Sequence, residues 1–227
     1  MSGVPALIRV GHRGAPALAP DNTIESFDAA LQIGVDMIEF DVLPGRTSPG
    51  ELFIAHDYGA LARHPPLTLD AALAHFATPA FARVRLQLDI KRRGHEQAVL
   101  DALDAHALRE RAFISTGVGA VLVRMRELAP ELRLGWTVPD LPLVNELPTV
   151  GHLYRRGVPE RAAARIRSGA INALVAHWSM VTARLVEAVS GAGGEIYVWT
   201  VDDAELIARL QALGVTGVIT NDPRLFG

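Results

Sequence analysis

Two carboxylates two residues apart inside an apolar stretch are the first sign of chemistry in this chain. Glu39 and Asp41 alternate with Ile38 and Phe40. In a strand, residues two apart project from the same face, so both acids converge on one point while the apolar side chains face the other way. Burying two acids together is costly unless a positive charge lies between them. The pattern predicts a divalent-cation site; the alternative is a structural salt bridge with arginine, which rarely offsets the burial of its charges.

Two histidines follow short apolar stretches of the same kind. His12, next to Arg13, comes at the end of residues 7–11, and His56 comes at the end of residues 51–55. A lone histidine at a strand end is more often a hydrogen-bonded core residue, but the neighbouring arginine favours a functional site. Imidazoles titrate near neutral pH, so two of them beside a cation suit proton transfer.

A third carboxylate lies close to the one lysine of the chain. Asp89 and Lys91 are two residues apart at the end of the stretch 84–90, and every other basic residue is arginine. A compact ammonium does not substitute for a planar guanidinium at a tight site, which suggests that position 91 needs lysine. Asp89 and Lys91 could pair only with each other, but we favour joint roles in the site. Three carboxylates without cysteine or histidine ligands favour a hard cation, Mg²⁺ or Ca²⁺, which also suits phosphate oxygens.

The elements that must position these residues alternate along the chain. Apolar stretches predict strands at 7–11, 36–42, 51–55, 84–90, 112–115, 132–138, 171–176, 195–201 and 215–220. Helical patterns lie between them at 22–33, 68–76, 95–107, 118–128, 160–168, 181–190 and 202–213, with Asn22, Thr68 and Asp202 as expected N-caps and Gly34 and Gly214 as expected ends. This alternation predicts a parallel sheet, and so many units in 227 residues predict a single closed β/α barrel over residues 1–227.

Nine predicted strands are one too many for an eight-stranded barrel. The link from Asp41 to His56 carries no helical pattern, yet its roughly nine residues could span about 30 Å when extended. We expect it to run back along the barrel, so that residues 51–55 join the barrel in parallel and His56 reaches the rim beside Asp41. An antiparallel hairpin is the alternative, and we expect it to place the two residues at opposite ends. Chemistry in such barrels lies at the C-terminal ends of strands, where the sequence also has Ser115, Thr116, His177, Trp199 and Asn221.

The composition narrows the classes of function. A net charge of −3 argues against binding nucleic acid through general basicity. The chain has no cysteine, which rules out disulfides and thiolate metal sites. It has no apolar run long enough for a membrane helix, no basic leader in residues 1–5, and no glycine-rich phosphate loop of the Walker or Rossmann type. We therefore expect a cytoplasmic enzyme without stable membrane insertion.

The motifs around these residues resemble those of glycerophosphodiester phosphodiesterases. They occur in the family's order across nearly the whole chain: His12-Arg13-Gly14, Ala19-Pro20-Asp21-Asn22-Thr23, Glu39-Phe40-Asp41, His56-Asp57, Asp89-Ile90-Lys91, Trp199-Thr200-Val201 and Gly217-Val218-Ile219-Thr220-Asn221-Asp222-Pro223. The resemblance implies a barrel of the phospholipase-C-like phosphodiesterase type. It also implies metal-dependent hydrolysis of a small glycerophosphodiester to glycerol 3-phosphate and an alcohol.

The resemblance further implies a role for each candidate residue. His12 and His56 would be the acid–base pair, Glu39, Asp41 and Asp89 would hold Mg²⁺ or Ca²⁺, Arg13 and Lys91 would neutralise phosphate, and Trp199 would line the glycerol pocket. Attack by the substrate's own glycerol hydroxyl, through a cyclic phosphate, and direct attack by water are both compatible with these residues. Asp21 and Asp89 stand where the family usually has glutamate. The stretch 58–63 lacks the family's usual Leu-Asp-Arg-Thr pattern, which suggests a small or open pocket.

Three other functions fit parts of the pattern. A lysophospholipase-D-like phosphodiesterase of the same fold would need an apolar groove, which Leu141, Leu143 and Leu153 could supply. A barrel that binds phosphate without turnover is compatible with the two aspartates, but the retention of both histidines argues against it. A metal-dependent lyase or isomerase fits less well, because such sites usually lack two facing histidines.

Overall fold

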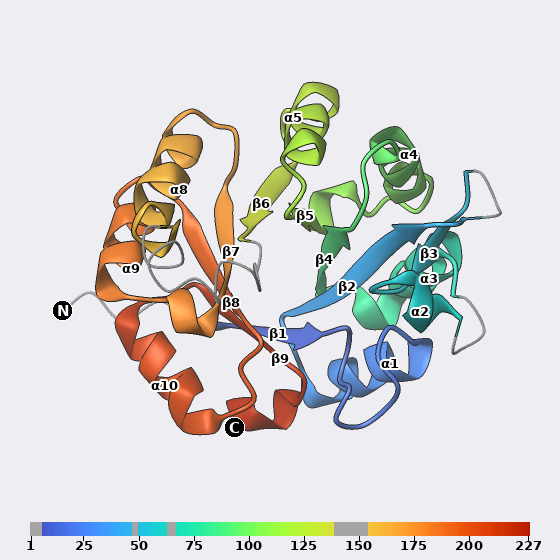
Figure 1. Cartoon of the computed structure of the whole chain (residues 1–227). Coiled ribbons are helices and arrows are strands. Elements are labelled where there is room, and N and C mark those ends of the chain that lie inside the picture. Colours follow the sequence, from blue (N-terminus) through green and yellow to red (C-terminus); the bar gives the residue numbers. More distant parts are fainter. Residues whose placement is uncertain (1–5, 47–49, 63–66, 139–153) are drawn as a thin grey trace.

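Eight parallel strands close into a barrel (Figure 1). The computed structural model describes residues 6–46, 50–62, 67–138 and 154–227. The barrel strands are β1 (Ile8–His12), β2 (Met37–Pro44), β4 (Arg85–Ile90), β5 (Ala112–Thr116), β6 (Arg133–Thr137), β7 (Ala173–His177), β8 (Glu195–Trp199) and β9 (Gly217–Thr220), and a further strand is β3 (Leu52–Ile54). The strand β1 pairs with both β2 and β9, which closes the ring. The predicted β/α barrel is confirmed.

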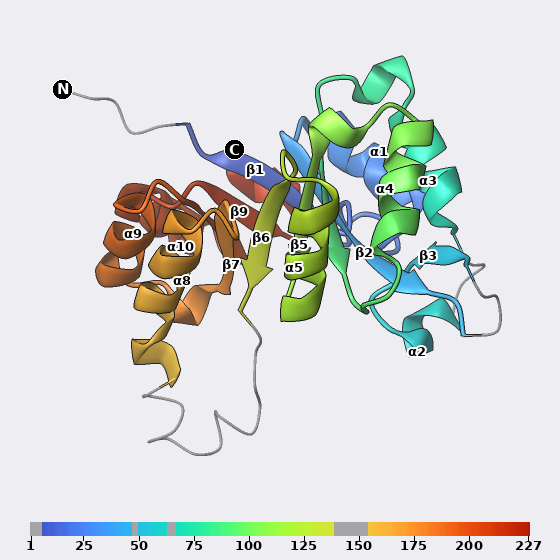
Figure 2. The ribbon, with the colours of Figure 1, turned by 90° about the horizontal axis from the view of Figure 1, so that it is seen from above.

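Helices surround the ring of strands (Figures 1 and 2). They are α1 (Ile24–Ile33), α2 (Tyr58–Leu61), α3 (Leu69–Phe76), α4 (Glu96–Ala105), α5 (Gly119–Leu128), α8 (Val158–Arg167), α9 (Ala183–Ser190) and α10 (Ala204–Leu213). Thr68 caps α3 as predicted, and Gly34 and Gly214 end α1 and α10 with φ of 87° and 94°, a conformation that favours glycine. Among the described residues, no helix has the length and apolar character needed to cross a membrane.

Two predicted N-caps are wrong by one residue. Thr23, not Asn22, caps α1, and Asp203, not Asp202, caps α10. The residue next to each cap has a side chain that is hydrogen-bonded elsewhere: Asn22 binds Asp41, and Asp202 binds Asn221. Asn22 and Asp202 therefore lie in or beside the C-terminal mouth of the barrel instead of capping a helix.

The strand β3 lies outside the barrel, so the predicted parallel crossover is wrong. It pairs antiparallel with the end of β2, with Leu43 opposite Phe53, and it lies with α2 beside the ring (Figures 1 and 2). The expectation that a hairpin would separate Asp41 from His56 is also wrong. The strand β2 continues past the end of its pairing with β4, so the chain turns beyond the rim of the barrel. The strand β3 then runs back towards the rim, where the backbone N of Ala55 donates to the carbonyl oxygen of Asp41 at 3.2 Å. His56 therefore reaches the rim from the opposite direction.

Apolar side chains form two cores, one on each side of the barrel wall. On the outside, the ring of Phe40 lies 5.3 Å from Phe76 of α3 and 5.9 Å from Phe27 of α1. The smaller inner core contains Val10, Met37, Phe113, Ala173, Val175, Tyr197 and Ile219. Met37, Phe113 and Tyr197 each precede a residue of the barrel mouth by two positions on the same strand: Glu39, Ser115 and Trp199. The inner core is therefore an apolar floor beneath a polar layer, as expected for the layered interior of such barrels.

Candidate active site

Polar side chains line a cavity of about 170 Å³ at the C-terminal mouth of the barrel. The strand register brings them to two adjacent levels: Glu39 pairs with His12 at one level, and Asp89 pairs with both Asp41 and Ser115 at the next. The lining residues are His12, Arg13, Glu39, Asp41, His56, Gln87, Asp89, Lys91, Ser115, Thr137, Val175, Trp199, Thr200 and Ile219. Every residue to which the sequence assigned a site role is in this set.

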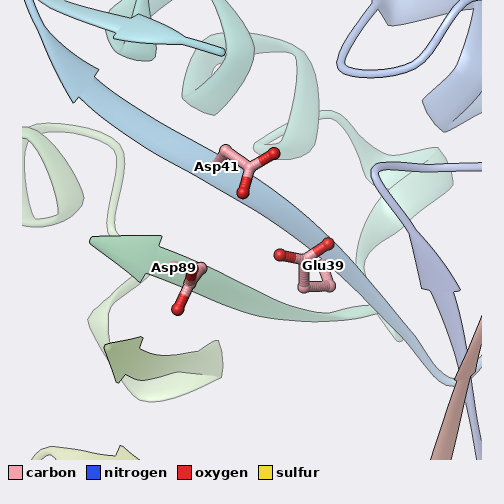
Figure 3. Close-up of side chains that lie close together, drawn as sticks. All are labelled: Glu39, Asp41 and Asp89. Carbon is pink, nitrogen blue, oxygen red and sulfur yellow. The ribbon is translucent and has the colours of Figure 1, made fainter. Parts of the chain in front are cut away.

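The three predicted metal ligands form one cluster. Glu39 and Asp41 project from one face of β2, and Asp89 projects from the neighbouring β4 (Figure 3). One carboxylate oxygen from each lies within 4.8 Å of the others. Glu39 and Asp41 are buried, and their burial follows from the alternation along β2 that turns Ile38 and Phe40 outwards.

Two cationic side chains, Lys91 and Arg13, form ion pairs with Asp41 and Asp89 of this cluster. Nζ of Lys91 lies 2.6 Å from Oδ1 of Asp41 and also contacts Asp89, while Nε of Arg13 lies 2.9 Å from Oδ2 of Asp41. Burial alone would raise the pKa of Asp41, but Lys91 and Arg13 lower it below its ordinary value. Burial likewise opposes the charge on Lys91, yet Asp89, Asp41 and Glu39 raise its pKa. Asp89 and Lys91 do pair with each other, but they share the interaction with Asp41.

Glu39 has a different environment from the other two acids. It accepts a hydrogen bond from the backbone N of Arg13 at 3.1 Å, and within the described part of the chain no lysine or arginine side chain forms an ion pair with it. Burial raises the pKa of Glu39 to about 8, and the charges of Asp41 and Asp89 contribute. Three carboxylates thus face two cationic side chains, and among the described residues Glu39 has neither a lysine nor an arginine as an ion-pair partner. These oxygen donors fit a hard divalent cation.

His12 lies between the cluster and the last strand. Its Nε2 is 3.9 Å from Oε2 of Glu39, and its Nδ1 is 2.7 Å from Oδ1 of Asn221. Burial lowers the pKa of His12, and the positive charge of Arg13 lowers it further. The ring is therefore neutral at pH 7 and can accept a proton.

His56 lies at the open side of the cavity, with its side chain 45% exposed. Its Nδ1 is 3.2 Å from Oδ2 of Asp57. The other oxygen of Asp57 caps α2 by accepting a hydrogen bond from the backbone N of Ala60 at 2.8 Å, and these contacts lower the pKa of Asp57 to about 2. The carboxylate beside His56 therefore stays ionised at neutral pH and can orient the ring through its Nδ1.

Polar residues on the next strands hold Asp89 in place. Oγ of Ser115 and Oγ1 of Thr137 donate to Oδ1 of Asp89 at 3.0 and 3.2 Å, and Nε2 of Gln87 donates to Oγ of Ser115 at 3.1 Å. Ser115 was expected at a strand end, whereas Gln87 and Thr137 were not predicted as site residues. The signal for Gln87 was its position two residues before Asp89, which places both on the inner face of β4.

Asn22 and the turn after β1 complete the site. Nδ2 of Asn22 donates to Oδ2 of Asp41 at 2.9 Å, and its φ of 59° allows this reach. The turn that carries His12 and Arg13 is tight, because a Cβ at Gly11 would lie 2.3 Å from the carbonyl oxygen of Gly14. The backbone here leaves no room for a larger residue.

Trp199 lines the cavity and has a buried donor without a partner among the described residues. Its Nε1 is buried and has no acceptor among the described residues, and buried donors normally have one. His177, another predicted rim residue, packs against Trp199 with ring centroids 5.3 Å apart but is not one of the residues that line the cavity. Leu141, Leu143 and Leu153, which the sequence suggested for an apolar groove, lie outside the described residues.

Comparison with known proteins identifies the family of the chain. Residues 12–73 and 83–225 match the model of the glycerophosphoryl diester phosphodiesterase family. A glycerophosphodiester phosphodiesterase from Caldanaerobacter subterraneus is 25% identical, over 94% of this chain and 93% of the relative.

Solved structures share the fold. The glycerophosphodiester phosphodiesterase of Agrobacterium tumefaciens superposes with a TM-score of 0.74 at 20% identity, covering 97% of this chain and 99% of the other. An Oleispira antarctica phosphodiesterase, solved in complex with the product sn-glycerol-3-phosphate, superposes with a TM-score of 0.72 at 21% identity, covering 96% and 94%. The chain belongs to the glycerophosphoryl diester phosphodiesterase family of phosphoric diester hydrolases.

Proposed function

We propose that this chain hydrolyses small glycerophosphodiesters to glycerol 3-phosphate and an alcohol, with His12 and His56 transferring the protons. The observation that carries the proposal is the gathering of three carboxylates, two cations and two histidines around one cavity. The Oleispira relative, crystallised with sn-glycerol-3-phosphate, supports the choice of product.

Glu39, Asp41 and Asp89 would hold Mg²⁺ or Ca²⁺. The support is the charge balance of the cluster, in which Glu39 lacks a cationic partner among the described residues, together with donors that are all oxygens. When bound, such an ion stabilises negative charge on phosphate oxygens and lowers the pKa of a nearby hydroxyl.

The two histidines divide the proton transfers. One histidine removes the proton of the attacking hydroxyl as its oxygen bonds to phosphorus. The bond from phosphorus to the leaving oxygen breaks, and the other histidine protonates that oxygen. If the nucleophile is the substrate's own glycerol hydroxyl, a cyclic phosphate forms, and water opens it with the two roles reversed; if the nucleophile is water, glycerol 3-phosphate forms in one step.

Arg13, Lys91 and Trp199 would bind the substrate. The ammonium of Lys91 has three donors, of which Asp41 and Asp89 engage two, so one is available for a phosphate oxygen. The guanidinium of Arg13 adds positive charge beside it. Trp199, which lines the cavity, would form part of the glycerol pocket.

The size of the cavity limits how much of the substrate can lie inside it. Its volume of about 170 Å³ is below the roughly 300–1,000 Å³ of typical ligand pockets. The glycerophosphoryl part of the diester would lie inside and the leaving alcohol at the mouth, near the exposed His56. We therefore propose low selectivity for the alcohol.

One assay tests the activity. Purified protein would be incubated with glycerophosphocholine, glycerophosphoethanolamine, glycerophosphoglycerol or glycerophosphoinositol in Mg²⁺, Ca²⁺ or EDTA, and released glycerol 3-phosphate would be measured. We expect release from several diesters and none in EDTA. No release from any diester with either metal would reject the proposal. The same assay with a lysophospholipid as substrate tests the alternative, a lysophospholipase-D-like activity.

A diester analogue that lacks the neighbouring glycerol hydroxyl identifies the nucleophile. Without that hydroxyl a cyclic phosphate cannot form, so turnover would stop if the substrate attacks itself and would continue if water attacks directly. Phosphorus NMR of the natural substrate during turnover would then detect or exclude the cyclic compound.

A further inference from the structure

A chain of hydrogen bonds connects Asp202 to His12 through Asn221. Oδ1 of Asp202 accepts from the backbone N of Asn221 at 2.7 Å and from Oγ1 of Thr220 at 2.9 Å. Its Oδ2 accepts from Nδ2 of Asn221 at 2.6 Å. Oδ1 of Asn221 then lies 2.7 Å from Nδ1 of His12. Although Asp202 is exposed, all these contacts hold its carboxylate against the end of β9.

The donors and acceptors in this chain leave one consistent assignment of protons. A carboxylate only accepts hydrogen bonds, so Asn221 must turn its NH₂ group towards Asp202. The amide oxygen of Asn221 therefore faces His12, and Nδ1 of His12 must carry the proton that it accepts. The other ring nitrogen, Nε2, is left with a free lone pair, and it is the one that lies near Glu39 in the cavity.

We propose that Asp202 is a positioning residue that, through Asn221, fixes the tautomer of His12 and so makes His12 the proton acceptor of the first step. His12 Nε2 takes the proton of the attacking hydroxyl while that oxygen bonds to phosphorus, and His56 gives its proton to the leaving oxygen. This inference rests on the proposed phosphodiesterase function and adds the order of the two histidines.

Replacing Asp202 by asparagine should reverse the arrangement. The amide oxygen introduced at position 202 must face the backbone N of Asn221, because that donor cannot move. The new NH₂ group then faces the NH₂ of Asn221, and two donors repel. The amide of Asn221 turns over and presents its NH₂ to His12, whose Nδ1 now has to accept, so the ring proton moves to Nε2.

Exchanging the two residues should restore the tautomer. In the double variant Asp202→Asn with Asn221→Asp, the amide at position 202 donates to the carboxylate at position 221. The second oxygen of that carboxylate accepts from Nδ1–H of His12. All donors and acceptors are again matched, and Nε2 regains its lone pair.

Long-range ¹H–¹⁵N correlation spectra of protein labelled with ¹⁵N-histidine read the tautomer directly. The His12 signal would be assigned by its loss in His12→Gln, and spectra would be taken at a pH at which the ring is neutral. We expect the Nδ1–H form in the wild type and in the double variant, and the Nε2–H form in Asp202→Asn. An Nε2–H ring in the wild type would overturn the proposal without any variant.

Kinetics complete the test. For Asp202→Asn we expect kcat to fall about 10- to 100-fold with KM unchanged, because a wrong tautomer removes a transition-state interaction and not substrate binding. The double variant should recover most of kcat. Asp203→Asn is the matched control: it changes the adjacent acid, keeps a good N-cap for α10, and should leave both tautomer and kcat unchanged.

The outcomes separate the two proposals. A wild-type protein with the Nδ1–H tautomer but no activity on any diester would reject the phosphodiesterase function and leave the hydrogen-bond chain standing. Full activity of Asp202→Asn with an inverted tautomer would reject the role of His12 as first acceptor. An unchanged tautomer in Asp202→Asn would reject the positioning role of Asp202.

Discussion

Nζ of Lys91 lies 2.6 Å from Oδ1 of Asp41, across the boundary between two neighbouring strands. The same ammonium contacts Asp89, so a single lysine neutralises acids from β2 and β4. The only lysine of the chain is therefore a structural counter-charge at the centre of the site. Any phosphate that it binds must share it with these two carboxylates.

Replacing Lys91 by methionine should destabilise the metal-free protein by about 3–5 kcal/mol, because it leaves buried carboxylates without their partner. Urea denaturation would measure the free energy of unfolding. Lys91→Arg should not restore it fully, because a planar guanidinium does not fit a site shaped for an ammonium. Arg92→Met, at an exposed neighbouring position, is the control; a loss for Lys91→Met no greater than for this control would contradict the assignment.

Replacing His12 or His56 by alanine should lower kcat by about 10²- to 10⁴-fold, the usual contribution of a positioned acid or base. Cation binding, followed by calorimetry, should persist in both variants because neither histidine is in the carboxylate cluster. His106→Ala, just after the C-terminal end of α4, serves as the control. A histidine whose loss leaves turnover intact would be removed from the mechanism.

Cation binding should release a proton. The pKa of Glu39 is raised to about 8, so at pH 7 the metal-free protein carries a proton on this acid, which a bound cation displaces. Affinity should therefore increase as the pH rises towards 8 and level off above it. Calorimetry at pH 7 in buffers of different ionisation enthalpy would detect about one proton released per ion. Identical heats in all buffers, or proton release that persists in Glu39→Gln, would refute this linkage.

Replacing Gly11 by alanine should reduce both stability and kcat. The new methyl group would meet the carbonyl of Gly14 at 2.3 Å, so the turn that carries His12 and Arg13 has to move. We expect a loss of about 1–3 kcal/mol in the free energy of unfolding, as for other overpacked sites. Gly119→Ala, at the start of α5 where nothing lies within 4 Å of the added carbon, should be neutral or stabilising. Equal behaviour of the two variants would mean that the turn adapts.

The alternation on β2 is the part of the site that the sequence predicts best. Acids at 39 and 41 between apolar residues at 38 and 40 define both faces of one strand, and the barrel then brings Asp89 beside them through strand register. These facts depend on local periodicity, which one sequence contains.

The direction of β3 and the positions of two caps depend on tertiary contacts that local patterns do not contain. A short link without helical pattern is compatible with a parallel crossover or a hairpin, and only the extension of β2 past the rim decides between them. Asn22 and Asp202 are good N-caps by residue type, but Asp41 and Asn221 offer them stronger partners. In both cases the neighbouring Thr23 or Asp203 caps the helix instead.

Because His56 follows a strand outside the closed ring, one of the two proposed proton-transfer residues lies on an addition to the barrel and the other, His12, lies on a barrel strand. The eight-stranded closure and the cluster of acids are built from β1, β2 and β4 to β9, without β3. We therefore expect redesign of the hairpin around β3 to change the choice of leaving alcohol more than the strength of ion binding.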